Sequence, residues 1–232
     1  MRNFFATVNL NRRRFVVAVL VFFCLLYLSY RIIPHKPALP SRTVIAKALN
    51  DTARAGSFIY RLQMKTIING KEGVYTDIEG RRKGKDRIYI KGRITESDIE
   101  FYQIGSTTYT KDQVSDDWIK INDNQLNQQE IFAAELNPLA NFGYREIVEV
   151  TYDGIVKDRE EKVWKYTVKP IVGDSYLEIL WKDFVYEFWI DRGSGLLTRG
   201  VVTAVSKTNP QDKLKIEVSF DYDTAFEIEP PV

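Results

Sequence analysis

The stretch Lys213–Tyr222, KLKIEVSFDY, indicates most plainly how this chain folds. Its apolar residues alternate strictly with polar ones and are Leu214, Ile216, Val218, Phe220 and Tyr222. Because successive side chains of a strand point to opposite faces of a sheet, this period of two predicts a strand with one buried and one solvated face. Such alternation is typical of antiparallel sheets, whereas the strands of parallel sheets are buried on both faces.

The segments on the N-terminal side of this stretch predict many more strands. Aromatic residues make up 13% of the chain, and turn signals such as Asn69-Gly70, Gly105-Ser106 and Asp153-Gly154 separate the apolar runs. We expect strands at 58–68, 73–82, 86–94, 98–105, 107–113, 118–121, 145–152, 161–170, 175–181, 184–191, 196–206 and 213–222.

Two segments are predicted to be helices. In 41–55 apolar residues recur at helical spacing between Ser41, a favourable N-cap, and Gly56, a favourable stop. In 128–136 the residues Asn127 and Glu130 resemble a capping box. Two short helices cannot cover some ten strands laid flat, so we expect the sheet to curl around them as a half-barrel. The predicted fold class is therefore α+β, a curved antiparallel sheet covered by about two helices.

An apolar N-terminal segment is expected to precede this domain as a transmembrane helix. Residues 15–30, FVVAVLVFFCLLYLSY, carry no charge, and the run through Ile33 has 19 residues. As a helix it would span about 28 Å, close to the roughly 30 Å of a bilayer's hydrocarbon core. The block Arg12-Arg13-Arg14 before it favours a cytoplasmic N-terminus and a domain on the outer side. A cleaved signal peptide is the rival interpretation, although no Ala-x-Ala-like cleavage site follows.

The expected organisation has four parts along the chain. They are a cytoplasmic N-terminus at 1–14, a transmembrane signal-anchor helix at 15–33, a Pro-rich linker at 34–40 and an extracytoplasmic domain at 41–232. The predicted location is the cell membrane, spanned once.

Composition argues against several classes of function. Six of the 33 basic residues lie before position 37, which leaves 27 basic and 31 acidic residues in the rest, a poor balance for binding nucleic acid. The one histidine, His35, lies in the linker, so the domain has no histidine-based catalytic triad. The one cysteine, Cys24, lies in the apolar run and offers no thiolate zinc site. We therefore expect no enzyme, no cofactor and no metal.

Several stretches resemble the LolA/LolB-like superfamily of lipoprotein carriers, and especially its LppX/LprG-type branch. The resemblance covers roughly residues 42–232 and is carried by degenerate β-sheet patterns. The matching stretches are TDIEGRRKGKDRIYIKGR at 76–93, IEFYQIGSTTYTKDQVSDDWIKI at 99–121, ELNPLANF at 135–142, VYEFWIDRGSGLLTRG at 185–200 and FDYDTAFEIEPP at 220–231.

This resemblance implies an incomplete barrel that encloses an apolar cavity. Members of the superfamily bind acyl chains and move lipids or lipoproteins across an aqueous envelope compartment. The chain departs from them in its expected uncleaved anchor, which fits a tethered acceptor or sensor better than a diffusing shuttle.

Two sets of residues are candidates for contact with such a ligand. Large side chains expected near an apolar interior are Trp118, Trp164, Tyr166, Phe184 and Trp189; in an ordinary sheet protein they would simply be core. A basic cluster that could meet anionic lipid headgroups consists of Arg81, Arg82, Lys83 and Lys85; it could equally be a solvated turn.

The leading hypothesis is a non-enzymatic domain that binds a lipid, an acyl chain or a lipoprotein. The alternative is a structural or interaction subunit of a cell-envelope complex, with the same fold and a filled core. A continuous apolar cavity would favour the first, and ordinary packing density the second.

Overall fold

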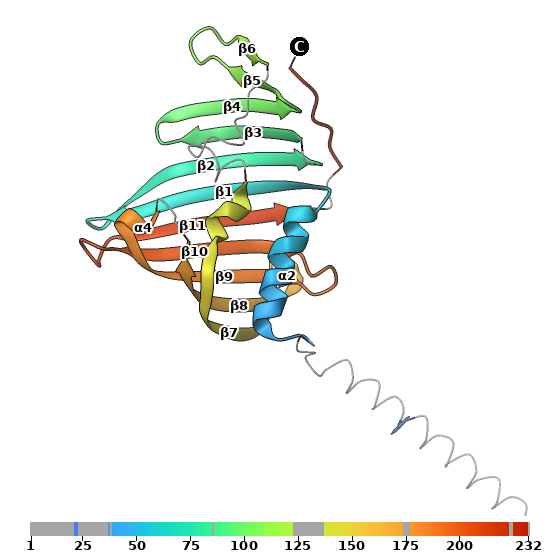
Figure 1. Ribbon diagram of the computed structural model, residues 1–232, viewed down its shortest axis with the longest axis vertical. Coiled ribbons are helices and arrows are strands. Elements are labelled where there is room, and N and C mark those ends of the chain that lie inside the picture. The colour runs from blue at the N-terminus through green and yellow to red at the C-terminus, as the bar shows by residue number, and fades with distance from the viewer. Residues whose placement is uncertain are drawn as a thin grey trace, which may run out of the picture. The chain divides into compact units, whose positions relative to one another are not determined.

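The computed structural model describes residues 21–22, 37, 39–84, 86–122, 137–173, 177–222 and 225–231 (Figure 1). The chain divides into two compact units, Met1–Ala38 and Leu39–Val232, and the described strands all belong to the second. These strands form one antiparallel sheet of 11 strands. They are β1 (Ser57–Ile68), β2 (Lys71–Lys83), β3 (Arg87–Ile94), β4 (Ser97–Ile104), β5 (Thr107–Lys111), β6 (Trp118–Ile121), β7 (Tyr144–Asp158), β8 (Glu161–Val172), β9 (Trp181–Asp191), β10 (Leu197–Ser206) and β11 (Lys213–Asp221).

The sheet consists of two consecutive meanders joined by its first and last strands. Its order is β6-β5-β4-β3-β2-β1-β11-β10-β9-β8-β7. The stretch that opened the sequence analysis becomes β11, and it pairs with β1 so that Val218 lies opposite Leu62 and Phe220 opposite Tyr60. Directly opposed residues share a face, so the apolar residues of both strands line the same side, called the inner face here.

Helix α2 (Ser41–Arg54) packs on this inner face, where Figure 1 shows it lying across the strands, and it contacts β7 and β10. Its apolar stripe of Val44, Ile45 and Ala48 is buried. The buried Thr52 hydroxyl fixes its C-terminal end, because it accepts a hydrogen bond from the Leu197 amide at 3.0 Å.

A short 3₁₀ helix, η3 (Pro138–Phe142), covers the inner face beside α2. The Phe142 ring lies directly over Gly200 of β10, where an added Cβ atom would come within 2.3 Å of the ring. Only glycine fits at this position, because the Cβ atom of any other residue would collide with the ring. The Tyr186 hydroxyl donates to the Gly143 carbonyl at 2.9 Å and holds the end of η3 against β9.

The inner face differs between two parts of the sheet. We call β1 and β7–β11 the filled half, because α2 and η3 pack on it and residues such as Val202 and Ile216 are 0% exposed. We call β2–β6 the open half, although its inner residues Ile78 and Ile90 are buried, because its edge strand is exposed on the same face. Its last strand, β6, has Ile119 at 46% and Ile121 at 41% exposure, although the register places both on the inner face.

Most of the predicted strands are confirmed, and two details are wrong. The expected strand at 175–181 is not formed, since helix α4 (Leu177–Leu180) lies there and β9 begins at Trp181. The expected turn at Asp153-Gly154 is a bulge within β7, between Tyr152 and Gly154, and the chain turns at 159–160 instead. A glycine with φ of +106° suits a bulge as well as a turn, which is why this signal was ambiguous.

The predicted helix at 41–55 is confirmed as α2, although Pro40 and not Ser41 stands at the N-cap. The second predicted helix, 128–136, lies outside the described residues.

The predicted fold class requires a correction at the N-terminus. Of the expected transmembrane helix at 15–33, only residues 21–22 are described. Among the described residues, no helix combines the length and the apolar character needed to cross a bilayer. From Leu39 onward the described residues form one large antiparallel sheet with the α-helices α2 and α4, and a transmembrane helix is not supported. The boundaries proposed at 1–14 and 34–40 stay predictions.

Candidate functional site

An apolar cleft of about 530 Å³ opens between β7, β8, β9 and α4. We call it the apolar cleft. Its volume lies within the roughly 300–1,000 Å³ typical of sites for small ligands. Its apolar lining consists of Val148, Pro170, Ile171, Val172, Trp181, Phe184 and Val185.

A bulge in β9 turns two large aromatic side chains toward this cleft. Thr203 and Val205 of β10 are two residues apart. They pair with Val185 and Lys182 of β9, which are three residues apart. The extra residue falls at Asp183, whose φ is +55°, a value that aspartate tolerates better than most residues. As a result Trp181 and Phe184, three positions apart, both line the cleft and are each 8% exposed.

The rim of the apolar cleft combines exposed apolar groups with cations. Val148 and Ile171 are 56% and 42% exposed, and the adjoining Ile179 and Leu180 of α4 are both 63% exposed. Three lysines line the same opening. Lys169 pairs with Glu149 at 2.7 Å, Lys207 donates to the Glu178 carbonyl, and Lys182 is exposed. Glu178 and Asp183 line the opening as well, so it carries charges of both signs. An apolar chain could lie in the cleft between these groups.

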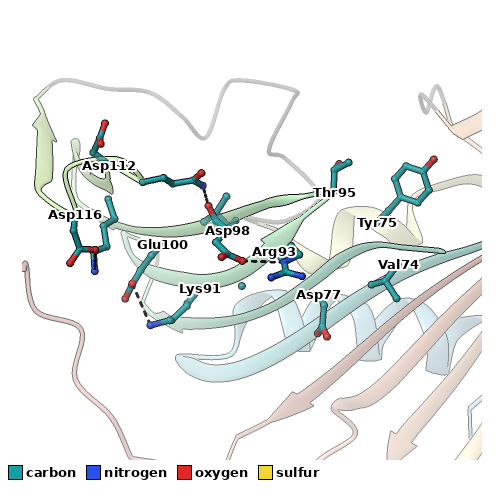
Figure 2. A pocket seen from close by; sticks show the side chains of 14 residues that line it. Val74, Tyr75, Asp77, Lys91, Arg93, Thr95, Asp98, Glu100, Asp112 and Asp116 are labelled. Atoms are coloured by element: carbon teal, nitrogen blue, oxygen red, sulfur yellow. Dashed lines mark hydrogen bonds and ion pairs between the residues drawn. The ribbon is translucent and has the colours of Figure 1, made fainter.

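A second hollow, of about 940 Å³, lies mainly on the other face of the open half (Figure 2). Its lining is charged, and its cations already have partners. Lys91 pairs with Glu100 at 3.4 Å, and Arg93 pairs with Asp98 at 3.1 Å. These pairs join neighbouring strands, and the lining as a whole has three basic and five acidic residues. An apolar chain gains nothing there, because it would have to desolvate paired ions.

Three of the five predicted cavity residues lie on the inner face. Trp164 and Tyr166 are neighbours on β8, two positions apart, and Tyr166 is 0% exposed. Phe184 lies further along the sheet and lines the apolar cleft. Whether any of the three contacts a ligand stays a prediction.

The other two predicted cavity residues lie on the outer face and pack against polar neighbours. The Trp118 ring meets the Tyr102 ring edge-on at 5.3 Å. The Trp189 ring has the Arg199 guanidinium 4.6 Å from its centre and the Lys165 ammonium at 5.1 Å. The sequence offered no means of separating these two tryptophans from Trp164, because alternation shows that two faces exist and not which face a helix covers.

The predicted basic cluster has partners within the protein. Arg81 pairs with Glu79 at 3.0 Å, and its guanidinium lies 5.6 Å from the centre of the Tyr89 ring. Arg82 donates to the Gly84 carbonyl at 3.2 Å, and Lys83 pairs with Glu227. Lys85 lies outside the described residues. Contact of this cluster with headgroups stays a prediction, and it would compete with these internal partners.

Residues of the apolar cleft that the sequence analysis missed include Trp181, Val148 and Val172. Trp181 ended a predicted strand that does not form. The missed signal was a break in alternation: Trp181 and Phe184 cannot both face inward in a regular strand, so their common character indicated a bulge.

These features define the fold as a large antiparallel sheet with helices packed on one face, and solved structures share it. LprF from Mycobacterium bovis shares the fold with a TM-score of 0.50 and 15% identity, over 83% of this chain and 98% of that one. Lipoprotein LppX from Mycobacterium tuberculosis (TM-score 0.47, 13% identity, 81% and 97% covered) and a LolA superfamily protein from Nitrosomonas europaea (0.33, 10%, 78% and 92%) are also similar. The match to LprF confirms the part of the predicted resemblance that concerns the fold.

No known family profile matches the chain, and no curated protein matches it in sequence.

Proposed function

We propose that the chain is a non-enzymatic binding protein for the acyl chain of a lipid or lipoprotein, and that the apolar cleft receives this chain. The observation that carries the proposal is the combination of an apolar volume of about 530 Å³ with exposed apolar side chains at its mouth. Burial of an acyl chain against this lining would supply about 0.8 kcal/mol per methylene.

The resemblance to lipoprotein carriers supports the same proposal. Since those carriers work in the aqueous envelope, we place the domain in an extracytoplasmic compartment, where it would shield an acyl chain from water during transfer.

A second candidate is an interaction subunit without a ligand. The close packing of β10 and β11 favours it, since Val202, Leu214 and Ile216 are at most 2% exposed and leave little room above these two strands. In that case the exposed apolar groups around α4 would contact a protein.

Native mass spectrometry with lipid extraction, on the full-length chain purified from its own host, separates the two candidates. We expect a lipid or an acylated species to copurify with the wild-type protein. Val148→Asp should abolish it, because a carboxylate placed in an apolar cleft must be desolvated when a chain binds. Val148 is 56% exposed, so the substitution should leave the fold intact.

The matched control is Val114→Asp. Val114 is 97% exposed in the turn between β5 and β6, and we expect this variant to keep its lipid. A wild-type protein that stays unliganded after incubation with a membrane lipid extract would reject the carrier and favour the interaction subunit. Equal loss of lipid in both variants would move the binding site away from the apolar cleft.

A further inference from the structure

Two buried donors on the inner face of β8 have no hydrogen-bond acceptor among the residues that the structure describes. They are Trp164 Nε1 and the hydroxyl of Tyr166, and each atom is shielded from solvent. An indole N–H can only donate, and a buried donor without an acceptor destabilises the folded state, because it has lost its hydrogen bonds to water. Two such groups side by side on one strand therefore destabilise the folded protein unless an acceptor pairs with them.

A third donor without a partner lies close by. Arg192 follows β9 two positions after Ile190, the residue opposite Trp164, and its Nε is also buried and unpaired within the described residues. The Tyr152 ring lies 5.2 Å from the Tyr166 ring, and the two residues are opposite each other on β7 and β8.

The electrostatics of this group favour an incoming acceptor. Burial raises the pKa of Tyr166 to about 12, so its hydroxyl keeps its proton at neutral pH and remains a donor. Burial also raises the pKa of Tyr152, and the positive charge of Arg192 opposes that rise. Three donors and one positive charge thus lie on adjacent strands, and oxygen atoms are the acceptors that suit all of them.

We propose that Trp164 Nε1, the Tyr166 hydroxyl and Arg192 Nε form a buried site for the oxygen acceptor at the polar end of a bound acyl lipid, a carboxylate or an ester carbonyl. This inference rests on the proposed acyl-binding function and adds the ligand's polar group to it. The tail would run along β8 toward Val172 in the apolar cleft, six residues or roughly 20 Å from Tyr166. Val168 lies between them at 1% exposure, so the ligand must displace the packing around it.

Hydroxyl deletion in the ligand-free protein is the first test. Tyr166→Phe removes a donor that has no acceptor, so we expect its melting temperature to be equal to or higher than that of the wild type. The control is Tyr186→Phe, on the neighbouring strand, which removes the bond to the Gly143 carbonyl and should lower the melting temperature. If Tyr166→Phe lowers the melting temperature as much as the control does, the hydroxyl already has a partner in the ligand-free protein, such as a buried water. That result would overturn the proposed site.

Titration with three probes tests the ligand's polar group. Palmitic acid carries a carboxylate, methyl palmitate carries a neutral carbonyl, and hexadecane carries no acceptor. We expect Tyr166→Phe to weaken palmitic acid binding about tenfold, the equivalent of about 1.4 kcal/mol for one charge-assisted hydrogen bond, and to change hexadecane binding less than about twofold. An equally weakened methyl ester identifies a carbonyl site, whereas an unaffected ester identifies a carboxylate site.

The two proposals fail in different ways. If Tyr166→Phe changes the binding of palmitic acid and hexadecane by the same factor, or changes neither, the proposed acceptor site is wrong. The acyl-binding function then still stands. If the wild-type protein binds none of the three probes, the proposed function fails and this inference fails with it.

Discussion

The filled half and the open half are built from the same kind of strand and both contribute inner residues to the core, since Ile78 and Ile90 of the open half are 1% and 0% exposed, but they differ at the edge strand β6. In the filled half the face is covered by α2 and η3, and Val202, Leu214 and Ile216 are at most 2% exposed. In the open half the edge strand β6 presents Ile119 and Ile121 to solvent at more than 40% exposure. Alternation of apolar residues therefore determines which side of a strand faces inward, but it does not determine how far a residue on that side is buried, since Ile90 on β3 is 0% exposed and Ile121 on β6 is 41% exposed.

The outer face of the filled half is also more buried than the outer face of the open half. In the filled half Trp189 lies beneath Arg199 and Lys165, and it buries Val163 and Val201 in a small second cluster. In the open half the corresponding charges are exposed, as in the Arg93–Asp98 pair at 64% and 77%. We infer that most of the folding free energy comes from the filled half.

The largest expected effect is a cavity in the filled half. Phe188→Ala removes a ring that is 1% exposed and lies 5.3 Å from the Phe142 ring, centre to centre. Truncation of a buried phenylalanine to alanine costs about 3–5 kcal/mol, from lost burial and from the cavity left behind. Chemical denaturation of the variant and of the wild type measures the difference in the free energy of unfolding.

The matched change in the open half is Phe101→Ala. Phe101 also lies on the inner face, on β4, and is 9% exposed. We expect it to cost less than Phe188→Ala, because fewer described elements pack above it. A cost equal to or greater than that of Phe188→Ala would show that the two halves contribute equally and would remove the distinction between them.

Much of this fold was accessible from the sequence, and the limits of prediction are physical. The alternation in 213–222 and its equivalents determined strands, faces and the antiparallel class, because a period of two admits no other regular structure. The positions of Trp118 and Trp189 on the outer face were not accessible, since a strand pattern does not say which of its faces a distant helix will cover. The apolar cleft was missed because it depends on the bulge at Asp183, and a bulge removes the periodicity on which prediction relies.

An intermediate effect is expected from pH, through Glu217 on the outer face of the filled half. Burial alone would raise the pKa of Glu217, but the hydrogen bond from Lys215 and the charge of Arg199 outweigh it and lower the pKa below its ordinary value. The carboxylate lies 2.8 Å from the Lys215 ammonium and 2.7 Å from the Arg199 guanidinium. Its contribution, on the order of 1 kcal/mol, is present above the unfolded-state pKa of about 4.3 and is lost as pH falls through the lower folded-state pKa.

Melting temperatures of the wild type and of Glu217→Gln between pH 7 and pH 3 test this sign. The difference in melting temperature between the wild type and the variant should be largest above about pH 4.3 and should decrease as the solution becomes more acidic. Asp98→Asn, which breaks an exposed pair in the open half, is the control and should have the smaller effect at pH 7. A gap that widens on acidification would mean that Glu217 is not stabilised as the anion.

The smallest expected effect concerns the exposed isoleucines of the open half, and it tests the comparison most directly. Ile121 is 41% exposed, and it continues the inner row that runs through Thr108 and Gln103. Ile121→Ser should change the free energy of unfolding by less than about 0.5 kcal/mol, as substitutions outside a core usually do. A loss above about 2 kcal/mol, the size found for truncation in a packed core, would mean that Ile121 is buried in solution. The edge of the open half would then be closed like its counterpart, and the distinction between the two halves would disappear.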